Sequence, residues 1–330
     1  MVKNPVLVAD IGGTNARFAI ASNDARHFEL AQTLECSDFL RVDLAIDTYL
    51  HSHKIDRVAA LSLAVAGPVV DETVRFPNSH WQIDCESLRQ RYSTDNAWLL
   101  NDWEAIAYSL VKLGSDDLMT LGNLKSTDPL DDSDFTYGAL GPGSGLGVAG
   151  LCRNKGILHP LVTEGGHVGF APESSLQGKI LEFLHTKFDA RVSRERLLSG
   201  PGLVNIYEAL CDIHGQDNPG LIAADIAVAG IARTDSTCTQ TMDIFFEILG
   251  QVAGDVALEL GATDGVFIGG GIAQRYPSQL QASRFRTGFE NKGRHHDLMQ
   301  KIPTHLITHK NPGLVGASVY AAERLSELEL

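Results

Sequence analysis

Residues 6–15 read Val-Leu-Val-Ala-Asp-Ile-Gly-Gly-Thr-Asn, and this stretch decides the fold of the N-terminal half. The run Val6–Ile11 is apolar except for Asp10, and it is broken by Gly12-Gly13 before alternation resumes over residues 16–20. This pattern predicts two strands joined by a tight turn.

The polar residues of this stretch also suit phosphate and Mg²⁺. Glycines let backbone N–H groups approach phosphate oxygens, Thr14 adds a donor, and Asp10 can hold a metal ion through water. A plain hairpin turn with an incidental Asp is the alternative, because glycine pairs are common in turns.

The pattern of strands and helices continues along the chain and predicts an α/β protein. Polar residues with little periodicity occupy residues 114–134, which we interpret as a boundary or an exposed loop. The expected strands are 58–65, 97–100, a pair flanking 141–147, and 266–268. The expected helices are 38–53, 103–111, 176–188, one with Pro201 at its start, 238–260 with Gly261 as its stop, and 312–328.

Length and composition limit the class of protein. A chain of 330 residues exceeds the usual size of one hydrophobic core, so two domains are expected. A formal net charge of −14 disfavours binding to nucleic acid or anionic lipid. Five scattered cysteines without a C-x-x-C pair, and no apolar stretch of about 18 residues, predict a cytoplasmic protein outside the membrane.

Two further glycine clusters are candidates for nucleotide binding. Residues 141–147 (Gly-Pro-Gly-Ser-Gly-Leu-Gly) match neither G-x-G-x-x-G nor a Walker A loop, which leaves a strand–turn–strand phosphate loop or a flexible bend. Gly269-Gly270-Gly271 follows a strand and allows close approach of a ribose or a flat ring, although a strand-to-helix turn is the favoured interpretation if the cluster is taken alone.

Polar residues at two places suit a neutral sugar. Asn101-Asp102 lies where a strand gives way to a helix, the usual location of α/β active sites, and an ionised Asp can accept a hydroxyl proton in phosphoryl transfer. Helix capping is the alternative for both residues. In Glu164-Gly165-Gly166-His167 we expect the glycines to let the two polar side chains turn inward together.

These motifs resemble those of bacterial glucokinases, within the hexokinase group of the actin-like ATPase superfamily. The matching segments run in the family's order over nearly the whole chain: 10–16, 77–81, 101–102, 141–149, 164–167 with 170–172, 195–205, 266–272 and 311–316. The resemblance implies that Asp102 is the general base. It implies sugar contacts by Asn101, Asp102, Glu164, His167 and Glu195.

The resemblance also implies how the nucleotide is bound. The expected contacts to ATP are Ala9, Asp10, Ile11, Gly12, Gly13 and Thr14 in the first loop, Gly143, Ser144 and Gly145 in the second, and Gly269 and Gly270 beside the adenosine. The implied fold is a two-lobed actin-like ATPase (ribonuclease H-like) fold with its active site in the interdomain cleft. The small domain would comprise residues 1–112 and 312–330, the large domain residues 113–311.

The function expected from this resemblance is transfer of a phosphoryl group from MgATP to the 6-hydroxyl of D-glucose, by a homodimer that feeds glycolysis. Another hexose such as mannose, or polyphosphate as the donor, would keep the same chemistry. A non-catalytic sugar sensor would not need Asp102. A filament-forming or chaperone-like relative would not need Glu164, His167 and Glu195.

Overall fold

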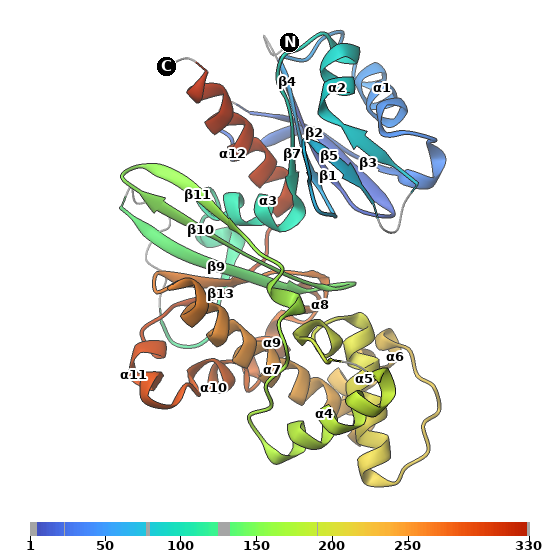
Figure 1. Cartoon of the computed structure of the whole chain (residues 1–330), viewed down its shortest axis with the longest axis vertical. Helices are drawn as coiled ribbons and strands as arrows, with labels where there is room; N and C mark the ends of the chain where they lie inside the picture. Colours follow the sequence, from blue (N-terminus) through green and yellow to red (C-terminus); the bar gives the residue numbers. More distant parts are fainter. Residues whose placement is uncertain (1–4, 23, 77–79, 125–132, 190, 329–330) are drawn as a thin grey trace. The chain divides into compact units, whose positions relative to one another are not determined.

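The computed structural model describes residues 5–22, 24–76, 80–124, 133–189 and 191–328. Contacts within the chain divide it into two compact units. Among the described residues, the first unit runs to Gly114 and resumes at His309, and the second spans Ser115 to Thr308. Figure 1 shows the elements of each unit.

The first unit is built on a five-stranded sheet in the order β3-β2-β1-β4-β7. β1, β2 and β3 are antiparallel neighbours, whereas β4 and β7 run parallel to β1. Its strands are β1 (Val6–Ile11), β2 (Asn15–Ala21), β3 (Phe28–Glu35), β4 (Ala60–Val65) and β7 (Ala97–Asn101), with the separate hairpin β5 (Thr73–Arg75) and β6 (Gln82–Asp84). Its helices are the 3₁₀ helix η1 (Cys36–Asp38), α1 (Val42–Ser52), α2 (Cys85–Tyr92), α3 (Asp102–Ser109) and α12 (Pro312–Glu327).

Helices bury the central strands of this sheet. Every residue of β4 is buried, which is typical of a strand covered on both faces. Tyr49 of α1 packs against Phe18 of β2 with ring centroids 5.6 Å apart. α12 packs against α3, β1 and β4 (Figure 1). The last helix of the chain therefore belongs to the core of the N-terminal unit.

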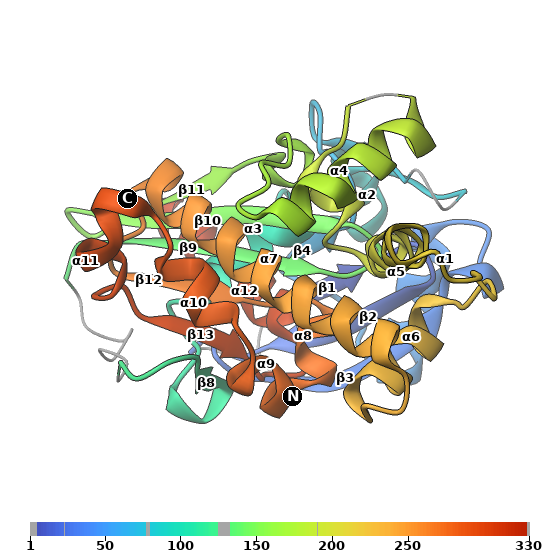
Figure 2. The same ribbon diagram turned by 90° about the horizontal axis from the view of Figure 1, so that it is seen from below.

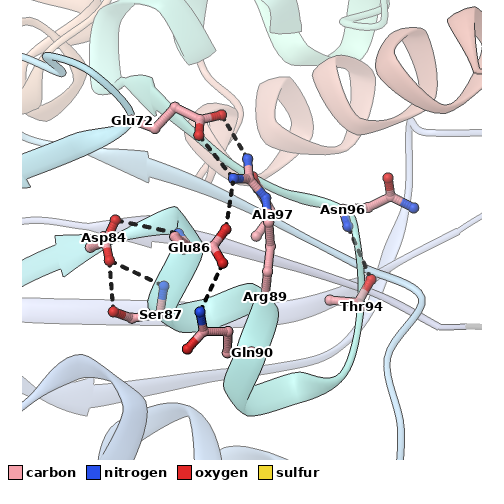
Figure 3. Close-up of polar contacts among 9 residues, drawn as sticks. All are labelled: Glu72, Asp84, Glu86, Ser87, Arg89, Gln90, Thr94, Asn96 and Ala97. Carbon is pink, nitrogen blue, oxygen red and sulfur yellow. Dashed lines mark hydrogen bonds and ion pairs between the residues drawn. The ribbon is translucent and has the colours of Figure 1, made fainter.

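Polar contacts fasten α2 to the small hairpin and to β7 (Figure 3). The Asp84 side chain accepts N–H bonds from Glu86 at 3.3 Å and Ser87 at 3.1 Å, and so caps the helix. Arg89 donates two bonds to the Glu72 carboxylate, at 2.9 and 2.6 Å, and a third to the Ala97 carbonyl at 3.0 Å. The paired guanidinium therefore links α2 to the turn before β5 and to the start of β7.

The second unit contains a six-stranded sheet in the order β11-β10-β9-β12-β13-β8. Its strands are β8 (Leu118–Thr120), β9 (Phe135–Pro142), β10 (Leu146–Asn154), β11 (Ile157–Val162), β12 (Gly265–Ile268) and β13 (Thr304–Ile307). Its longer helices are α4 (Ser175–Phe188), α5 (Gly200–His214), α6 (Ala223–Ile231) and α7 (Ser236–Leu260). The shorter ones are η2 (Ser115–Asp117), η3 (Gly165–His167), η4 (Arg194–Arg196), α8 (Gly271–Arg275), α9 (Pro277–Ala282), α10 (Phe285–Glu290), η5 (Gly293–His295) and α11 (His296–Met299).

The long helix α7 organises the core of the second unit. Gly261 ends this helix in the left-handed conformation, as the sequence predicts. The Asp235 side chain caps its N-terminus at Ser236, two residues before the predicted start. Apolar side chains of α7 join one large buried cluster with those of α5, α10 and β12. Figure 2 shows α10 lying alongside α7.

The two sheets share one pattern of strand order and direction. β9, β10 and β11 are antiparallel neighbours, and β12 and β13 run parallel to β9. The order β11-β10-β9-β12-β13 thus repeats β3-β2-β1-β4-β7, with β8 added at the edge. Residues 9–14 (Ala-Asp-Ile-Gly-Gly-Thr) and 140–145 (Leu-Gly-Pro-Gly-Ser-Gly) resemble each other in sequence, and they lie at equivalent turns, β1–β2 and β9–β10.

Most predicted elements are confirmed within a few residues, but some are wrong. The predicted helix 38–53 begins only at Val42, because residues 36–38 form a 3₁₀ helix and Phe39 is extended. The edge strand β3 was not predicted, because its side chains are mostly exposed or half-buried and give no apolar run. β13 was not predicted either, although it is fully buried, because four residues make too short a pattern.

Candidate active site

The parallel strands of the first unit bring two predicted site segments to one edge of the sheet. Ile11 at the end of β1 is in register with Val65 of β4, and Val65 is in register with Asn101 of β7. Asp10 and the pair Asn101-Asp102 therefore lie at the carboxyl ends of β1 and β7, with β4 between them. Carboxyl ends of parallel strands are where α/β proteins bind ligands.

The β1–β2 turn has an ordered backbone and an exposed tip. The Gly12 N–H donates to the Asn15 carbonyl at 2.9 Å, and the Cys36 N–H donates to the Thr14 carbonyl at 2.8 Å. Gly13 and Thr14 are exposed. The turn can therefore present backbone N–H groups and the Thr14 hydroxyl to an anion.

Asp10 forms an ion pair with Arg17, which the sequence motifs did not single out. Its Oδ2 atom accepts a bond from Arg17 Nη1 at 3.3 Å. Burial raises the pKa of Asp10, and the neighbouring Arg17 charge opposes that shift. The start of α12 lies close by, since a β-carbon at Gly313 would be 3.0 Å from Asp10 Cγ.

This environment fits Mg²⁺ held through water. Among the described residues, no cluster of three or more His, Cys, Asp or Glu side chains forms a metal site of protein ligands alone. Mg²⁺ commonly binds through one or two carboxylates together with waters and substrate phosphates. The single carboxylate of Asp10, beside a turn suited to phosphate, provides that donor set.

Asn101 is held by three hydrogen bonds at the start of α3. Its Oδ1 accepts the Trp103 N–H at 2.9 Å, and its own N–H donates to Glu104 Oε2 at 3.3 Å, which completes a capping box. Its Nδ2 donates to the Gly67 carbonyl at 3.2 Å. Asp102 Oδ1 also accepts the Trp103 N–H, at 2.9 Å. The capping alternative is therefore correct for Asn101, and capping fixes the position of Asp102, the first residue of the helix.

The second glycine turn, between β9 and β10, contacts Glu195. The Gly143 N–H donates to the Gly145 carbonyl at 2.8 Å, and the Gly200 N–H donates to the Gly143 carbonyl at 2.8 Å. Glu195 Oε2 accepts the Leu146 N–H at 3.0 Å. A β-carbon at Gly145 would lie 2.5 Å from the same oxygen, so a side chain at this position would displace the Glu195 carboxylate.

The third glycine cluster packs against the second turn. The Gly269 N–H donates to the Leu140 carbonyl at 2.8 Å. Gly270 has a φ of +81°, and a β-carbon there would lie 2.5 Å from the Pro142 carbonyl oxygen. The cluster is the strand-to-helix turn that leads from β12 into α8, and the same geometry places it beside the β9–β10 turn.

Glu164 and His167 lie together, but their side chains do not turn inward as the sequence reading expected. His167 Nε2 is 3.9 Å from Glu164 Oε2, and the side chains are 60% and 77% exposed. The buried residues of this 3₁₀ turn are Gly165 and Gly166, which pack closely against Val148 and Leu146 of β10. The glycines bury the backbone of the turn and leave the polar side chains on the surface of the second unit.

Each unit therefore carries its own group of predicted site residues. The first unit holds residues 9–14 and 101–102, and the second holds residues 143–145, 164, 167, 195 and 269–270. Residues 77–79 of the matching segment 77–81 lie outside the described residues.

The Arg17 contact had a signal in the sequence. A hairpin that pairs Ile11 with Ala16 must also pair Asp10 with Arg17. Arg194, whose buried side chain bonds to Asp255 and Glu259, had no such signal, because those partners lie 61 and 65 residues away along the chain.

Comparison with known proteins assigns this arrangement to a class. The chain has the actin-like ATPase fold that is also found in ROK-family sugar kinases. A ROK family glucokinase from Streptomyces griseus, solved with glucose and AMPPNP, superposes with a TM-score of 0.65 at 18% identity. The superposition covers 96% of this chain and 98% of that one. The family model for glucokinase matches residues 7–324, and the chain belongs to the glucokinase family.

Two closer relatives carry the same name. A glucokinase of Xylella fastidiosa (strain M12) is 40% identical over 324 residues, covering 97% of this chain and 95% of the relative. The crystal structure of a glucokinase from an Antarctic psychrotroph superposes with a TM-score of 0.88 at 33% identity, over 97% of this chain and 99% of that one. Within the described part of this chain, every helix is too short or too polar to cross a membrane.

Proposed function

We propose that this chain transfers the γ-phosphoryl group of MgATP to the 6-hydroxyl of D-glucose, with Asp102 as the general base. The observation that carries the proposal is the position of Asp102. It begins α3 at the carboxyl end of β7, on the sheet edge that also carries Asp10 and the first glycine turn. A carboxylate held there by a capped helix start suits proton removal from a hydroxyl beside a phosphate site.

The reaction requires little covalent chemistry from the protein. Asp102 accepts the proton of the 6-hydroxyl as the oxygen bonds to the γ-phosphorus. The bond between the γ-phosphorus and the β–γ bridging oxygen breaks, and ADP leaves with that oxygen. Positioning and charge stabilisation supply most of the rate in such transfers.

Backbone groups and one carboxylate suit the nucleotide. We assign phosphate binding to residues 9–14 and 143–145, and the adenosine contact to Gly269 and Gly270. Asp10 would hold Mg²⁺ through water, and the ion, when bound, neutralises charge on the phosphates. An AMPPNP complex is known for the Streptomyces griseus neighbour, which supports a nucleotide donor in this fold.

Polar side chains with both donors and acceptors suit the sugar. Asn101, Glu164, His167 and Glu195 are our candidates for binding the remaining hydroxyls, because carboxylate, amide and imidazole groups pair well with them. The exposed Glu164 and His167 side chains are accessible to a ligand. Glu195 retains acceptor capacity beyond its one oxygen bonded to Leu146.

The domain bounds 1–112 with 312–330 and 113–311, the cytoplasmic location and the homodimer belong to the same proposal. They rest on the sequence and on the family.

The test is a panel of sugars and donors. ADP release from MgATP would be measured with glucose, mannose, fructose, N-acetylglucosamine and 6-deoxyglucose, and the product would be identified by phosphorus NMR. The proposal predicts strong stimulation by glucose, none by 6-deoxyglucose, and a 6-phosphate product. Greater stimulation by mannose, or turnover with polyphosphate alone, would assign another substrate. Binding of glucose without turnover would indicate a sugar sensor.

A further inference from the structure

Arg194 is a buried cation next in the chain to Glu195, a residue proposed to bind the sugar. It lies in η4, directly before Glu195, and its side chain is only 6% exposed. Its guanidinium bonds to both oxygens of Glu259, Nη2 to Oε1 at 2.7 Å and Nη1 to Oε2 at 3.2 Å. Nη2 also reaches Asp255 Oδ2 at 3.2 Å. Two carboxylates one turn apart on α7 therefore hold one guanidinium in a fixed orientation.

A second buried cation extends this network. Lys292 Nζ lies 2.8 Å from Asp255 Oδ1 and 2.7 Å from Glu173 Oε1, and its side chain is 7% exposed. Asn291 Nδ2 donates to the other Glu173 oxygen at 2.9 Å. Asp255 thus bridges Arg194 and Lys292, and the network joins η4 to α7, to the residues that follow α10 and to the segment before α4.

The backbone of Arg194 touches the other proposed sugar-binding turn. Its N–H donates to the Val168 carbonyl at 2.9 Å, and the Phe170 N–H donates to the Val192 carbonyl at 3.0 Å. A bridge pairs Gly169 with Ser193 between these two bonds. The residues that follow His167 therefore run alongside the residues that precede Glu195.

We infer that Arg194 is a positioning residue for sugar recognition, which rests on the proposed function. Its side chain is fixed to α7, its backbone holds the turn that carries Glu164 and His167, and its chain neighbour is Glu195. Loss of the guanidinium would leave Glu259 without its cation and Asp255 with Lys292 alone, and it would remove the side-chain link through which η4 and the turn bonded to it are tied to α7. Glucose recognition then depends on a residue that does not touch glucose.

Two substitutions at Arg194 and one control test the inference. Arg194→Met removes the charge, whereas Arg194→Lys keeps the charge but cannot form the bidentate pair with Glu259. Arg196→Met is the matched control, because Arg196 lies on the same 3₁₀ helix on the other side of Glu195 and stacks its guanidinium on the Phe188 ring, with Cζ 4.2 Å from the centroid. The readouts are Kd for glucose by calorimetry, and KM for glucose, KM for ATP and kcat.

We expect Arg194→Met to weaken glucose binding about tenfold or more, with a smaller change in KM for ATP, and Arg194→Lys to recover part of the loss. Arg196→Met should change glucose binding less than about threefold. A folded Arg194→Met protein with unchanged glucose binding would overturn the inference, as would equal losses in the control.

Glu259→Gln covers the case in which Arg194→Met does not fold. It weakens one pair while Arg194 keeps Asp255, and Glu259 is 46% exposed, so little buried charge is left unpaired. A measurable rise in Kd for glucose supports the inference, and none contradicts it. If the wild-type protein neither binds nor phosphorylates glucose, the proposed function fails first, and the inference fails with it.

Discussion

Glu195 Oε2 accepts a hydrogen bond from the Leu146 backbone N–H at 3.0 Å. A residue proposed to bind the sugar therefore also holds the turn proposed to bind phosphate. Leu146 is the first residue of β10, directly after the second glycine turn. Carboxylate acceptors form strong hydrogen bonds with backbone donors. Loss of the acceptor at Glu195 should therefore affect both substrates.

Substitutions at Glu195 separate its two contacts. Glu195→Gln keeps an oxygen that can accept the Leu146 N–H, whereas Glu195→Ala keeps none. We expect both variants to raise KM for glucose about tenfold or more, because both lose a charged acceptor. Only Glu195→Ala should also raise KM for ATP. Steady-state kinetics with each substrate varied would check this, and an unchanged KM for ATP in Glu195→Ala would show that the Leu146 contact has no role in nucleotide binding.

Glu164 has a simpler predicted role, because its side chain is exposed and, among the described residues, lies near only His167 of its own turn. Glu164→Ala should raise KM for glucose about tenfold or more, the value of one hydrogen bond to a charged group, and leave the melting temperature unchanged. Glu182→Ala, an exposed position on α4, is the control. An unchanged KM for glucose would remove Glu164 from the sugar site.

Gly270 is predicted to tolerate no side chain. Gly270→Ala would force a β-carbon to 2.5 Å from the Pro142 carbonyl oxygen at a φ of +81°, and should destabilise the second unit by about 1–3 kcal/mol. KM for ATP should rise as well, since the same contact supports the second phosphate turn. Gly271→Ala is the control for stability, because a β-carbon there meets nothing within 4 Å. Equal melting temperatures for the two variants would contradict the prediction.

His305 on β13 should make the second unit sensitive to acid. Its side chain is 1% exposed, its Nδ1 has no partner among the described residues, and burial lowers its pKa from 6.5 to about 4. Between pH 6.5 and pH 4 the His305 imidazole is protonated in the unfolded chain but stays neutral in the folded chain. The free energy of unfolding should therefore fall by about 3 kcal/mol between pH 6.5 and pH 4.

The variant His305→Leu checks this prediction. The denaturation midpoint of His305→Leu should fall less between pH 6.5 and pH 4 than that of the wild-type protein. His295→Gln, which changes an exposed side chain, should keep the wild-type pH dependence. Parallel pH profiles for the wild-type protein and His305→Leu would assign the acid sensitivity to other groups.

The sequence predicts the architecture well where apolar runs are bounded by glycine. β1, β4, β9, β10 and β12 follow from such runs, and α7 follows from its long apolar stripe and Gly261. The edge strand β3 gives no such signal, because its environment is half solvent. Strand order is a long-range property, and the repeat of one order in both sheets was suggested only by the likeness of two turns.

The candidate site is predictable in part. The glycine turns and Asn101-Asp102 carry local signals, and their chemistry limits what they bind. Contacts between distant segments carry none. Neither the bond from Leu146 to Glu195 nor the network around Arg194 can be read from spacing, because each joins segments tens of residues apart. The exposure of Glu164 and His167 also depends on how their turn packs against β10.

The variant Asp102→Asn tests whether Asp102 is the general base, with glucose binding and phosphoryl transfer measured on the same sample. Asparagine preserves the size of the side chain and its contact with the Trp103 N–H, but it cannot accept the 6-hydroxyl proton as a carboxylate does. Asp95→Asn, an exposed position just before the other end of β7, is the control. We expect Asp102→Asn to bind glucose with nearly wild-type Kd while kcat falls by about 10²-fold or more. Turnover near the wild-type rate would contradict Asp102 as the base.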